Sequence, residues 1–455
     1  MVRRVLIAGG VGLIVLASPV MVGRLSQPTG SYARARPTAV SAHQVPRATG
    51  VEVAQRSSDA VQLTVQNLSA QPAALVAGGK VTFSAAIVSN TTLSNLIVSL
   101  EVYNAAWSNV YTVRTTHDVA AGILQRLAVS WSVPANRSSG IYHVLVNVFG
   151  SDWAPHYAET CCNSLVVVNA SHAIALGAWV PGANWNPHVV DSYAHLVGAY
   201  PRIINYYQSW LPPNVTSLNV GLLNTYRSHG ATTMISWEPD VPDRKILDGS
   251  YDAFIHQYAR AAAMYGKPFY LRFAWEKNGN WSAWSPGLNG NTSASYVAAW
   301  RHVHDIFVAE HATNVRWVWA PNVAFHGSTP FAEVYPGDEY VDWVALDGYN
   351  WGAVGAWHSW TSAYQTFGPS LLSLMALTNK PIMISEIAST ELGGDKAAWI
   401  DNWFLHDLPA YFPRVRAVVW FDEKKETDWR VNSSPRVLAA FRQVVANPLY
   451  QGRLP

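Results

Sequence analysis

The segment Phe269–Glu276 (FYLRFAWE) is a short apolar run that ends in polar side chains. A helical pattern precedes it over Tyr251–Tyr265, and another follows over Ala294–Glu310. A continuous apolar strand between two helices is typical of a parallel sheet that helices cover on its faces. The segment therefore predicts one repeat of an α/β fold.

The same alternation continues through residues 170–455, which we predict to form one domain. Eight apolar segments are expected as strands: Ala173–Val180, Arg202–Trp210, Ala231–Pro239, Pro268–Glu276, Val315–Asn322, Asp342–Asn350, Lys380–Ala388 and Val415–Glu423. Helical stretches separate the strands, and Asp395–Tyr411 and Pro435–Val445 are further examples. Eight such units in about 285 residues fit a (β/α)8 TIM barrel.

Active sites of such barrels lie at the carboxyl ends of the strands, so the residues there are candidates for function. Glu276 ends the fourth expected strand and Glu386 the seventh, on opposite sides of the barrel mouth. Trp237, Asn322, Tyr349 and Trp420 end other strands. Two carboxyl groups across a cleft of aromatic rings suit glycoside hydrolysis, which needs one protonated acid and one ionised nucleophile. A single rim glutamate would more simply be read as a salt-bridge partner, but the pair favours catalysis.

The neighbours of these two glutamates suit those roles. Trp275 and Trp281 could form an apolar surround that raises the pKa of Glu276, and Tyr349 could donate a hydrogen bond to Glu386. If the carboxyl groups lie about 5–5.5 Å apart, the reaction retains configuration through a covalent intermediate. This chemistry needs no metal or cofactor, and we expect none.

Residues 59–169 show period-two alternation instead, as in Val81, Phe83, Ala85 and Ile87. About seven short strands with turn signals between them predict an all-β immunoglobulin-like or fibronectin-like sandwich before the barrel. Trp107, Trp153 and Tyr157 could form a sugar-binding face, although a spacer with aromatic residues in loops and core is the favoured interpretation. The adjacent Cys161 and Cys162 could form a vicinal disulfide or stay as thiols.

The N-terminal segment 1–24 resembles a targeting signal. Arg3 and Arg4 precede an apolar run from Val5 to Val22, which predicts a cleaved signal peptide or a retained signal anchor. Residues 25–58 are rich in Pro, Ser, Ala and Arg and predict a flexible linker. We therefore expect a secreted, extracellular protein, tethered to the membrane only if the segment is retained.

The composition excludes several classes of protein. Charged residues make up only 13% of the 455 residues and the net charge is +2, so the basic stripe of a nucleic-acid-binding protein is absent from the sequence. Two adjacent cysteines cannot supply a four-ligand zinc site. The 21 tryptophans stand out, because a flat apolar ring with one N–H donor suits a sugar ring. The expected partner is a polysaccharide substrate, and the chain is expected to act as a monomer.

Several segments resemble glycoside hydrolase family 26, which includes β-mannanases and some mixed-linkage β-glucanases and xylanases. Arg272–Trp284 (RFAWEKNGNWSAW) is similar to its acid/base motif, and Lys380–Ser389 (KPIMISEIAS) is similar to its nucleophile motif. Further similar segments are Ile235–Pro239, Trp317–Asn322, Asp342–Asn350 and Trp420–Arg430. The resemblance spans about residues 172–450 and implies a retaining endo-β-1,4-glycosidase, with mannan as the first expected substrate and mixed-linkage β-glucan or xylan as alternatives.

The resemblance also implies individual roles. It makes Glu276 the acid/base, Glu386 the nucleophile and Tyr349 the residue that holds the nucleophile, while Arg272 braces the carboxylates from below. The residues expected to bind substrate are Tyr349, Trp281, Trp284, Trp420, Trp275, Asn278, Trp237 and Asn322, with Trp420 as the platform under the sugar.

One departure from the family pattern bears on activity. The family usually has His before the acid/base glutamate and Met after it, where this chain has Trp275 and Lys277. An inward-pointing Lys277 would lower the pKa of Glu276 and blunt it as an acid, whereas an outward-pointing one would have no effect. A catalytically weakened carbohydrate-binding surface protein is therefore the rival hypothesis.

Overall fold

The computed structural model describes residues 60–168, 173–211, 217–356 and 358–454. The expected signal segment 1–24 and linker 25–58 lie outside the described residues. Within those ranges, no helix has both the length and the hydropathy needed to cross a membrane.

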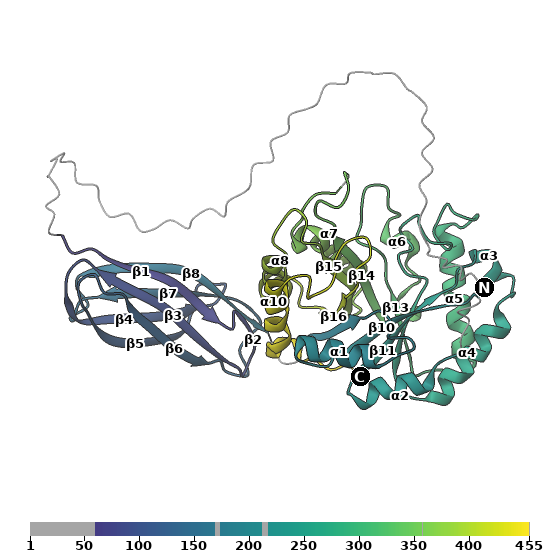
Figure 1. Ribbon diagram of the computed structural model, residues 1–455, viewed down its shortest axis with the longest axis horizontal. Coiled ribbons are helices and arrows are strands. Elements are labelled where there is room, and N and C mark those ends of the chain that lie inside the picture. Colours follow the sequence, from purple (N-terminus) through teal and green to yellow (C-terminus); the bar gives the residue numbers. More distant parts are fainter. Residues whose placement is uncertain (1–59, 169–172, 212–216, 357, 455) are drawn as a thin grey trace, which may run out of the picture. The chain divides into compact units, whose positions relative to one another are not determined.

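Eight strands between Leu63 and Val168 form two sheets (Figure 1). They are β1 (Leu63–Gln71), β2 (Ala74–Val76), β3 (Lys80–Ser89), β4 (Leu93–Tyr103), β5 (Asn109–Val119), β6 (Gln125–Ser132), β7 (Gly140–Phe149) and β8 (His156–Val168). One sheet has the order β1-β3-β6 and the other β2-β8-β7-β4-β5. Alternate side chains of both sheets, such as Phe83, Leu100 and Val146, share one hydrophobic core, which accounts for the period-two pattern.

Details of these sheets differ from a plain antiparallel pattern. The short strand β2, which the sequence did not predict, pairs in parallel with β8.

Cys161 is disulfide-bonded, so the thiol alternative does not hold for it. The immunoglobulin-like or fibronectin-like identity and the domain limits at 59, 169 and 170 stay predictions.

All eight strands expected after residue 172 are present and close into a parallel barrel (Figure 1). They are β9 (Ala175–Trp179), β10 (Ile203–Ser209), β11 (Thr232–Glu238), β12 (Phe269–Phe273), β13 (Val315–Trp319), β14 (Trp343–Asn350), β15 (Ile382–Ser389) and β16 (Val415–Phe421). The order runs from β10 to β16 and closes through β9. Strands covered on both faces are mostly apolar, which explains the apolar runs in the sequence.

Helices follow the strands along the chain. They are α1 (His188–Val197), α2 (Val220–Ser228), α3 (Asp243–Leu247), α4 (Asp252–Tyr265), α5 (Ser293–Ala309), α6 (Phe331–Val334), η2 (Asp338–Tyr340), α7 (Ala363–Leu377), α8 (Lys396–Asn402), η3 (Trp403–Asp407), α9 (Leu408–Tyr411), α10 (Pro435–Ala446) and η4 (Pro448–Tyr450).

The single helix expected over Asp395–Tyr411 is instead interrupted. A π-helical turn, η3, separates α8 from α9, and the Leu408 N–H donates to the carbonyl of Trp403, five residues earlier. Pro409, next in the chain, has no N–H and cannot continue an α-helical ladder at that point.

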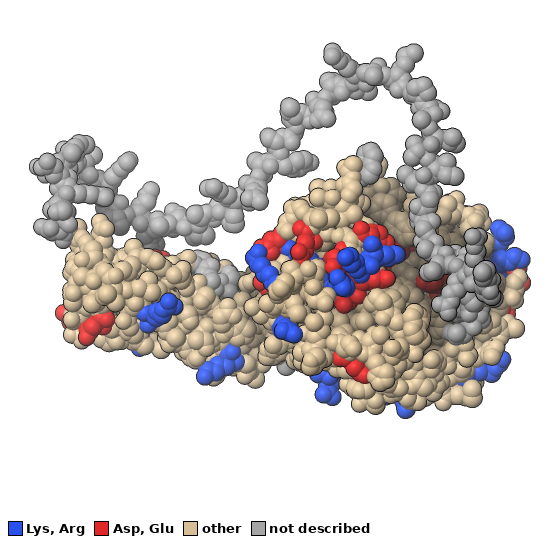
Figure 2. Space-filling model, in the orientation of Figure 1, with Lys and Arg blue, Asp and Glu red and all other residues tan. Residues whose placement is uncertain are grey.

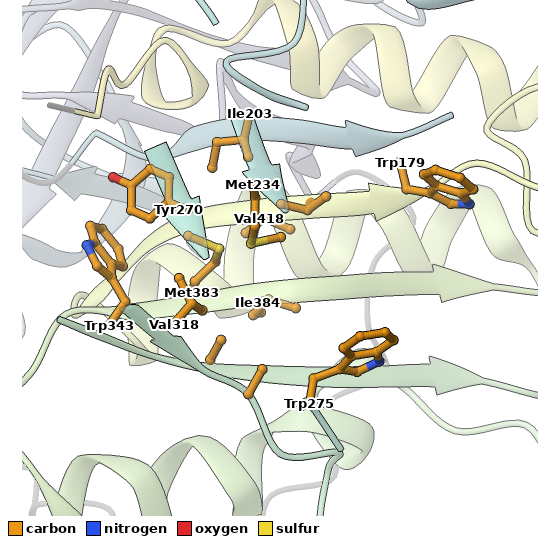
Figure 3. Packing of buried hydrophobic residues seen from close by; sticks show 14 of the residues in the cluster. Trp179, Ile203, Met234, Tyr270, Trp275, Val318, Trp343, Met383, Ile384 and Val418 are labelled. Atoms are coloured by element: carbon orange, nitrogen blue, oxygen red, sulfur yellow. The ribbon is translucent and has the colours of Figure 1, made fainter. Parts of the chain in front are cut away.

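Apolar side chains from the strands pack together in the barrel (Figure 3). Met234, Val318 and Met383 lie in the middle of this view, with Tyr270 and Trp343 toward one end of the strands. Trp179 and Trp275 lie toward the other end, where the arrowheads mark the carboxyl ends. The apolar packing therefore leaves the carboxyl ends as the place for a polar site.

Charged side chains are sparse on the face shown in Figure 2, and acidic and basic groups lie together where they gather. Among the ion pairs of the protein, Lys425 pairs with Glu426 and Arg430 with Asp428. This face carries no one-sided basic patch of the kind that nucleic-acid binding needs.

Candidate active site

The loop after β12 fixes the position of Glu276. Ala274 and Glu276 have φ of 42° and 54°, a left-handed conformation that costs a non-glycine residue about 1–3 kcal/mol. Two backbone hydrogen bonds hold this conformation: Ala274 N–H to the Trp237 carbonyl at 3.2 Å, and Glu276 N–H to the Ala320 carbonyl at 2.6 Å. The hydrogen bonds to β11 and to the residue after β13 thus fix the direction in which the Glu276 side chain points.

Two N–H donors bind the Glu276 carboxyl group. Asn322 Nδ2 donates to Oε1 at 2.8 Å, and Trp281 Nε1 donates to Oε2 at 2.7 Å. Burial raises the pKa of Glu276 to about 7, and the negative charge of Glu386 adds to this effect. The hydrogen bonds from Asn322 and Trp281 act in the opposite direction. Glu276 can therefore hold a proton near neutral pH, as a general acid must.

Glu386 has the environment of an ionised carboxylate. It lies on β15 and only 4% of its surface is exposed. Tyr207 donates to Oε1 at 2.5 Å, Arg272 Nη2 donates to the same oxygen, and the Tyr349 hydroxyl donates to Oε2. All three partners donate to this carboxyl group and hold it in one orientation.

A buried arginine joins Glu386 to a second carboxylate. Arg272 is fully buried; its Nη1 donates to both oxygens of Asp347 at 2.8 Å, and its Nε donates to Ser236 Oγ at 2.9 Å. A register shift between β14 and β15 leaves Ser385 as the extra residue and places Glu386 directly opposite Asp347. The expectation that Arg272 braces the carboxylates agrees with these contacts.

The carboxyl groups of the site lie close together. One oxygen from each of Glu276, Asp347 and Glu386 lies within 4.8 Å of the other two. Three carboxylates at this spacing could hold a cation, but Arg272 already supplies the positive charge to two of them. The remaining pair, Glu276 and Glu386, face each other with one group suited to carry a proton and the other suited to stay charged.

Four of the residues expected to bind substrate contact this pair or its supports. Trp281, with 41% of its surface exposed, and Asn322 bond to Glu276, while Tyr349 bonds to Glu386. The Trp275 ring is nearly buried and lies over the Arg272 guanidinium, with 4.8 Å between that group and the ring centroid.

The prediction that Trp420 is a sugar platform is wrong. Trp420 is fully buried, and its Nε1 donates to the Trp429 carbonyl at 3.0 Å. Its ring lies 5.3 Å from that of Phe441 on α10, because alternation along β16 turns it toward the helices. The next residue, Phe421, turns the other way, and its ring lies 5.6 Å from that of Tyr349.

Trp237, Trp284 and Asn278 are also buried and unavailable to substrate, contrary to expectation. Trp237 packs against Trp210 and Tyr258, each with 4.6 Å between ring centroids. Trp284 donates to the Trp275 carbonyl at 2.8 Å. Asn278 bonds to both the N–H and the carbonyl of Asn322 at 2.8 Å. Trp284 and Asn278 therefore support residues of the site, and Trp237 belongs to the core.

Lys277 does not point at the acid. Its ammonium lies 3.3 Å from both carboxylate oxygens of Asp243 and 4.4 Å from the centroid of the Tyr296 ring, with 1% of the residue exposed. Burial lowers the pKa of Lys277 to about 8, and Asp243 opposes that shift. The feature that motivated the weakened-enzyme hypothesis is therefore a buried ion pair directed away from Glu276.

Tyr207 and Asp347 belong to the site but were not predicted from the sequence, and neither was Glu238, whose pKa the charge of Glu386 helps to raise. Tyr207 lies near the carboxyl end of β10, and that position was the available signal. Glu238 ends β11, and burial, with the charge of Asp240 second, raises its pKa to about 7. The role of Asp347 depends on the register shift beside Ser385, which no sequence pattern indicates.

We expect Tyr207→Phe to lower kcat by about 10-fold or more, because the nucleophile loses one of its three donors. The substitution removes one oxygen and keeps the ring against Trp179, 4.8 Å away between centroids. Steady-state kinetics should show the loss, with Tyr206→Phe as the matched control, since the hydroxyl of Tyr206 is buried and lacks a hydrogen-bond partner. Equal kinetics for Tyr207→Phe and the unmodified enzyme would contradict this role.

The family model described as "Glycosyl hydrolase family 26" matches residues 179–409, which include Glu276 and Glu386. Endoglucanase H of Acetivibrio thermocellus is 39% identical over 286 residues, which are 61% of this chain and 31% of that protein. Mannan endo-1,4-beta-mannosidase A and B of Caldalkalibacillus mannanilyticus is 35% identical over 121 residues, which are 26% of this chain and 21% of that protein. Beta-1,3-xylanase TXYA of a Vibrio species is 28% identical over 176 residues, 37% of this chain and 33% of that protein.

The chain thus spans about a third or less of the length of these curated relatives. Among solved structures, a GH26 β-mannanase from Bacteroides ovatus has 15% identity and a TM-score of 0.46, with 61% of this chain and 90% of that chain covered. The YdhT protein of Bacillus subtilis has 18% identity and a TM-score of 0.47, with 59% and 85% covered.

Proposed function

The chain belongs to glycosyl hydrolase family 26, and from this membership and the geometry of the site we propose that it cuts internal β-1,4 linkages of a polysaccharide with retention of configuration. The observation that carries the proposal is the approach of the Glu276 and Glu386 carboxyl groups, which have oxygens within 4.8 Å of each other. Retaining enzymes place the two carboxyl groups about 5–5.5 Å apart, whereas inverting enzymes need about 6.5–9.5 Å to admit a water molecule.

In the first step, Glu386 attacks the anomeric carbon while Glu276 gives its proton to the leaving glycosidic oxygen. The bond from the anomeric carbon to that oxygen breaks, and a glycosyl ester of Glu386 forms. In the second step, the Glu276 carboxylate takes a proton from water, the water oxygen attacks the anomeric carbon, and Glu386 leaves as a carboxylate.

The charge of Glu386 explains how one residue serves as acid and then as base. The negative charge of Glu386 is the second cause that raises the pKa of Glu276, after burial. Esterification removes that charge, so the pKa of Glu276 falls in the intermediate, where a carboxylate is needed. Arg272, Tyr207 and Tyr349 hold Glu386 before the attack and stabilise it again when it leaves.

Mannan is the polymer that the resemblance to the family implies, and we propose it as a first substrate. A second candidate, a β-glucan, is favoured by the relative at 39% identity, which is named as an endoglucanase and matches 61% of this chain. The replacement of the family's usual His by Trp275, whose N–H can donate but not accept, also points to an altered contact beside the acid. A weakened surface protein is less well supported, because Lys277 pairs with Asp243.

The test is release of reducing sugar by the full chain from galactomannan, glucomannan, mixed-linkage β-glucan and xylan, with Glu386→Ala as the blank. Release from at least one polymer that is absent in the variant would support the proposal, and the polymer would name the substrate. A β-configured product seen first by NMR would support retention. No release from any of the four, or an α-configured first product, would contradict the proposal.

We also propose that the chain acts outside the cell as a monomer and that residues 59–169 form an immunoglobulin-like or fibronectin-like domain. The support for export is the charged and then apolar segment 1–24, followed by the linker composition of residues 25–58. Detection of the protein in the culture medium, with a mature N-terminus after residue 22, would confirm a cleaved signal.

A pH profile should report the proton on Glu276. Because the acid must be protonated, kcat/KM should fall as the pH rises through about 7. Trp281→Phe keeps an aromatic ring but removes the N–H donor whose hydrogen bond lowers the pKa of Glu276. The fall of kcat/KM should therefore move to higher pH in this variant. Trp284→Phe is the matched control, because its N–H bonds to the Trp275 carbonyl instead. An unchanged fall in Trp281→Phe would rule out Glu276 as the group that the fall reports.

A further inference from the structure

The five-stranded sheet β2-β8-β7-β4-β5 has an outer face that carries two exposed tryptophans. Val102 and Val144 point into the core, so their neighbours Tyr103 on β4 and His143 on β7 point to the opposite side. Trp107 and Trp153, with 54% and 49% of their surfaces exposed, come from the β4–β5 and β7–β8 hairpins. These hairpins lie at opposite ends of the face, since β4 and β7 run antiparallel and are adjacent.

Trp107 is held flat against this face. Its ring stacks on the His143 imidazole with 4.7 Å between centroids and an angle of 8°, and the Tyr103 ring lies 5.9 Å away. Trp107 has a φ of 57°, and its N–H donates to the Asn104 carbonyl at 2.9 Å. The strained hairpin thus folds the ring back onto the sheet, which supports one side of the ring and leaves half of the residue open.

Trp153 is held at the other end by different contacts, because its ring is tilted by 54° against that of Phe149 and is not stacked on it. It has a φ of 66°, and its ring lies 5.3 Å from that of Phe149 on β7. The Arg114 guanidinium on β5 lies 5.1 Å from the centroid of the indole ring. Because β4 lies between β7 and β5 in the sheet, the indole ring and the Arg114 side chain together span the width of β4.

The two rings are several sugar units apart. Tyr103 pairs with His143 and Ile97 pairs with Phe149, so the two aromatic positions differ by six residues of β4, or about 20 Å. The outward positions between them include the polar side chains of Glu101, Asn147 and Glu159, together with one apolar side chain, Leu145. A protein-binding surface of this size would need a continuous apolar patch, whereas here polar groups separate two aromatic platforms.

We propose that this outer face binds one chain of a neutral β-linked polysaccharide, with Trp107 and Trp153 under its sugar rings and the polar strip toward its hydroxyl groups. The C–H faces of β-linked pyranoses pack on flat aromatic rings, and their equatorial hydroxyls need donors and acceptors at the sides. Tyr157 is not part of this face, because it packs toward the core. The site is separate from the catalytic glutamates and would hold the hydrolase on its polymer between cuts.

The test uses the full chain with Glu386→Ala, so that the polymer is bound but not cut. Native gels cast with glucomannan, galactomannan, mixed-linkage β-glucan or xylan measure retardation and hence affinity. We expect Trp107→Ala and Trp153→Ala each to weaken affinity by about 3- to 10-fold, and the double variant by more than about 10-fold. Ile123→Ala, at a residue that is 60% exposed in the loop between β5 and β6, is the surface control and should migrate like its parent.

A second measurement separates this face from the cleft. In the chain with Glu386 intact, the double variant should keep its turnover of short soluble oligosaccharides and lose activity on insoluble polymer. Retardation that is undiminished in the double variant, or a parent that no polymer retards, would overturn the proposal. Failure of the proposed function would look different, because hydrolysis would then be absent while polymer retardation still depended on Trp107 and Trp153.

Discussion

Glu386→Ala should lower kcat on the natural polymer by about 10⁵-fold or more, because no other group can form the glycosyl ester. Tyr207, Arg272 and Tyr349 all direct their donors at this carboxylate, and without it they have no group to orient for attack. Arg272 keeps both bonds to Asp347, so the barrel should still fold. Residual reducing-sugar release and a far-UV circular dichroism spectrum check the two halves of this result.

A stronger test of Glu386 uses azide and an aryl β-glycoside with a good leaving group. The variant leaves space on the face that the nucleophile normally attacks, so azide should enter there and give an α-glycosyl azide of inverted configuration. Glu333→Gln, which changes an exposed carboxylate on α6, is the control and should behave as the unmodified enzyme does. Full activity of Glu386→Ala would remove it from the mechanism.

The sequence predicted the barrel well because each strand is buried on both sides. Such strands are mostly apolar, so each apolar run marks an element, and the polar residues at its carboxyl end mark the site. Glu276 and Glu386 were found in this way, and the structure brings them together. It was harder to predict which side chains at a strand end point into the cleft than to predict the strand itself.

The errors share a physical cause. Trp420 and Trp237 occur at strand ends, as cleft residues do, but alternation turns their side chains toward the helices. A shift of one residue in register reverses which side chain faces the cleft, and composition carries no signal for it. Glu386 faces Asp347 only because of the register shift beside Ser385. Lys277 likewise found a partner, Asp243, from a helix 34 residues away in the sequence.

Glu276→Ala should lower kcat/KM on polysaccharide by about 10³-fold, because an alkoxide leaving group then departs without a proton. The first step on an aryl glycoside with a good leaving group needs no acid and should be nearly unaffected. Glycosyl-enzyme should therefore accumulate, since the variant also lacks the base for the second step. A burst of aryl leaving group followed by slow turnover would show this in a stopped-flow experiment.

The azide product then assigns the two glutamates independently of rate. In Glu276→Ala, azide attacks the ester of Glu386 and should give a β-glycosyl azide of retained configuration, the opposite anomer from that of Glu386→Ala.

The pH profile of Glu276→Ala on the aryl substrate should also lose the fall in activity near pH 7, because the group whose pKa is raised to about 7 by burial and by Glu386 is gone. Glu238, whose pKa is also about 7, is the alternative source of such a fall, and Glu238→Gln distinguishes the two. If the fall in activity near pH 7 survives in Glu276→Ala but disappears in Glu238→Gln, the titrating group is Glu238. That result would contradict the role of Glu276 as the acid.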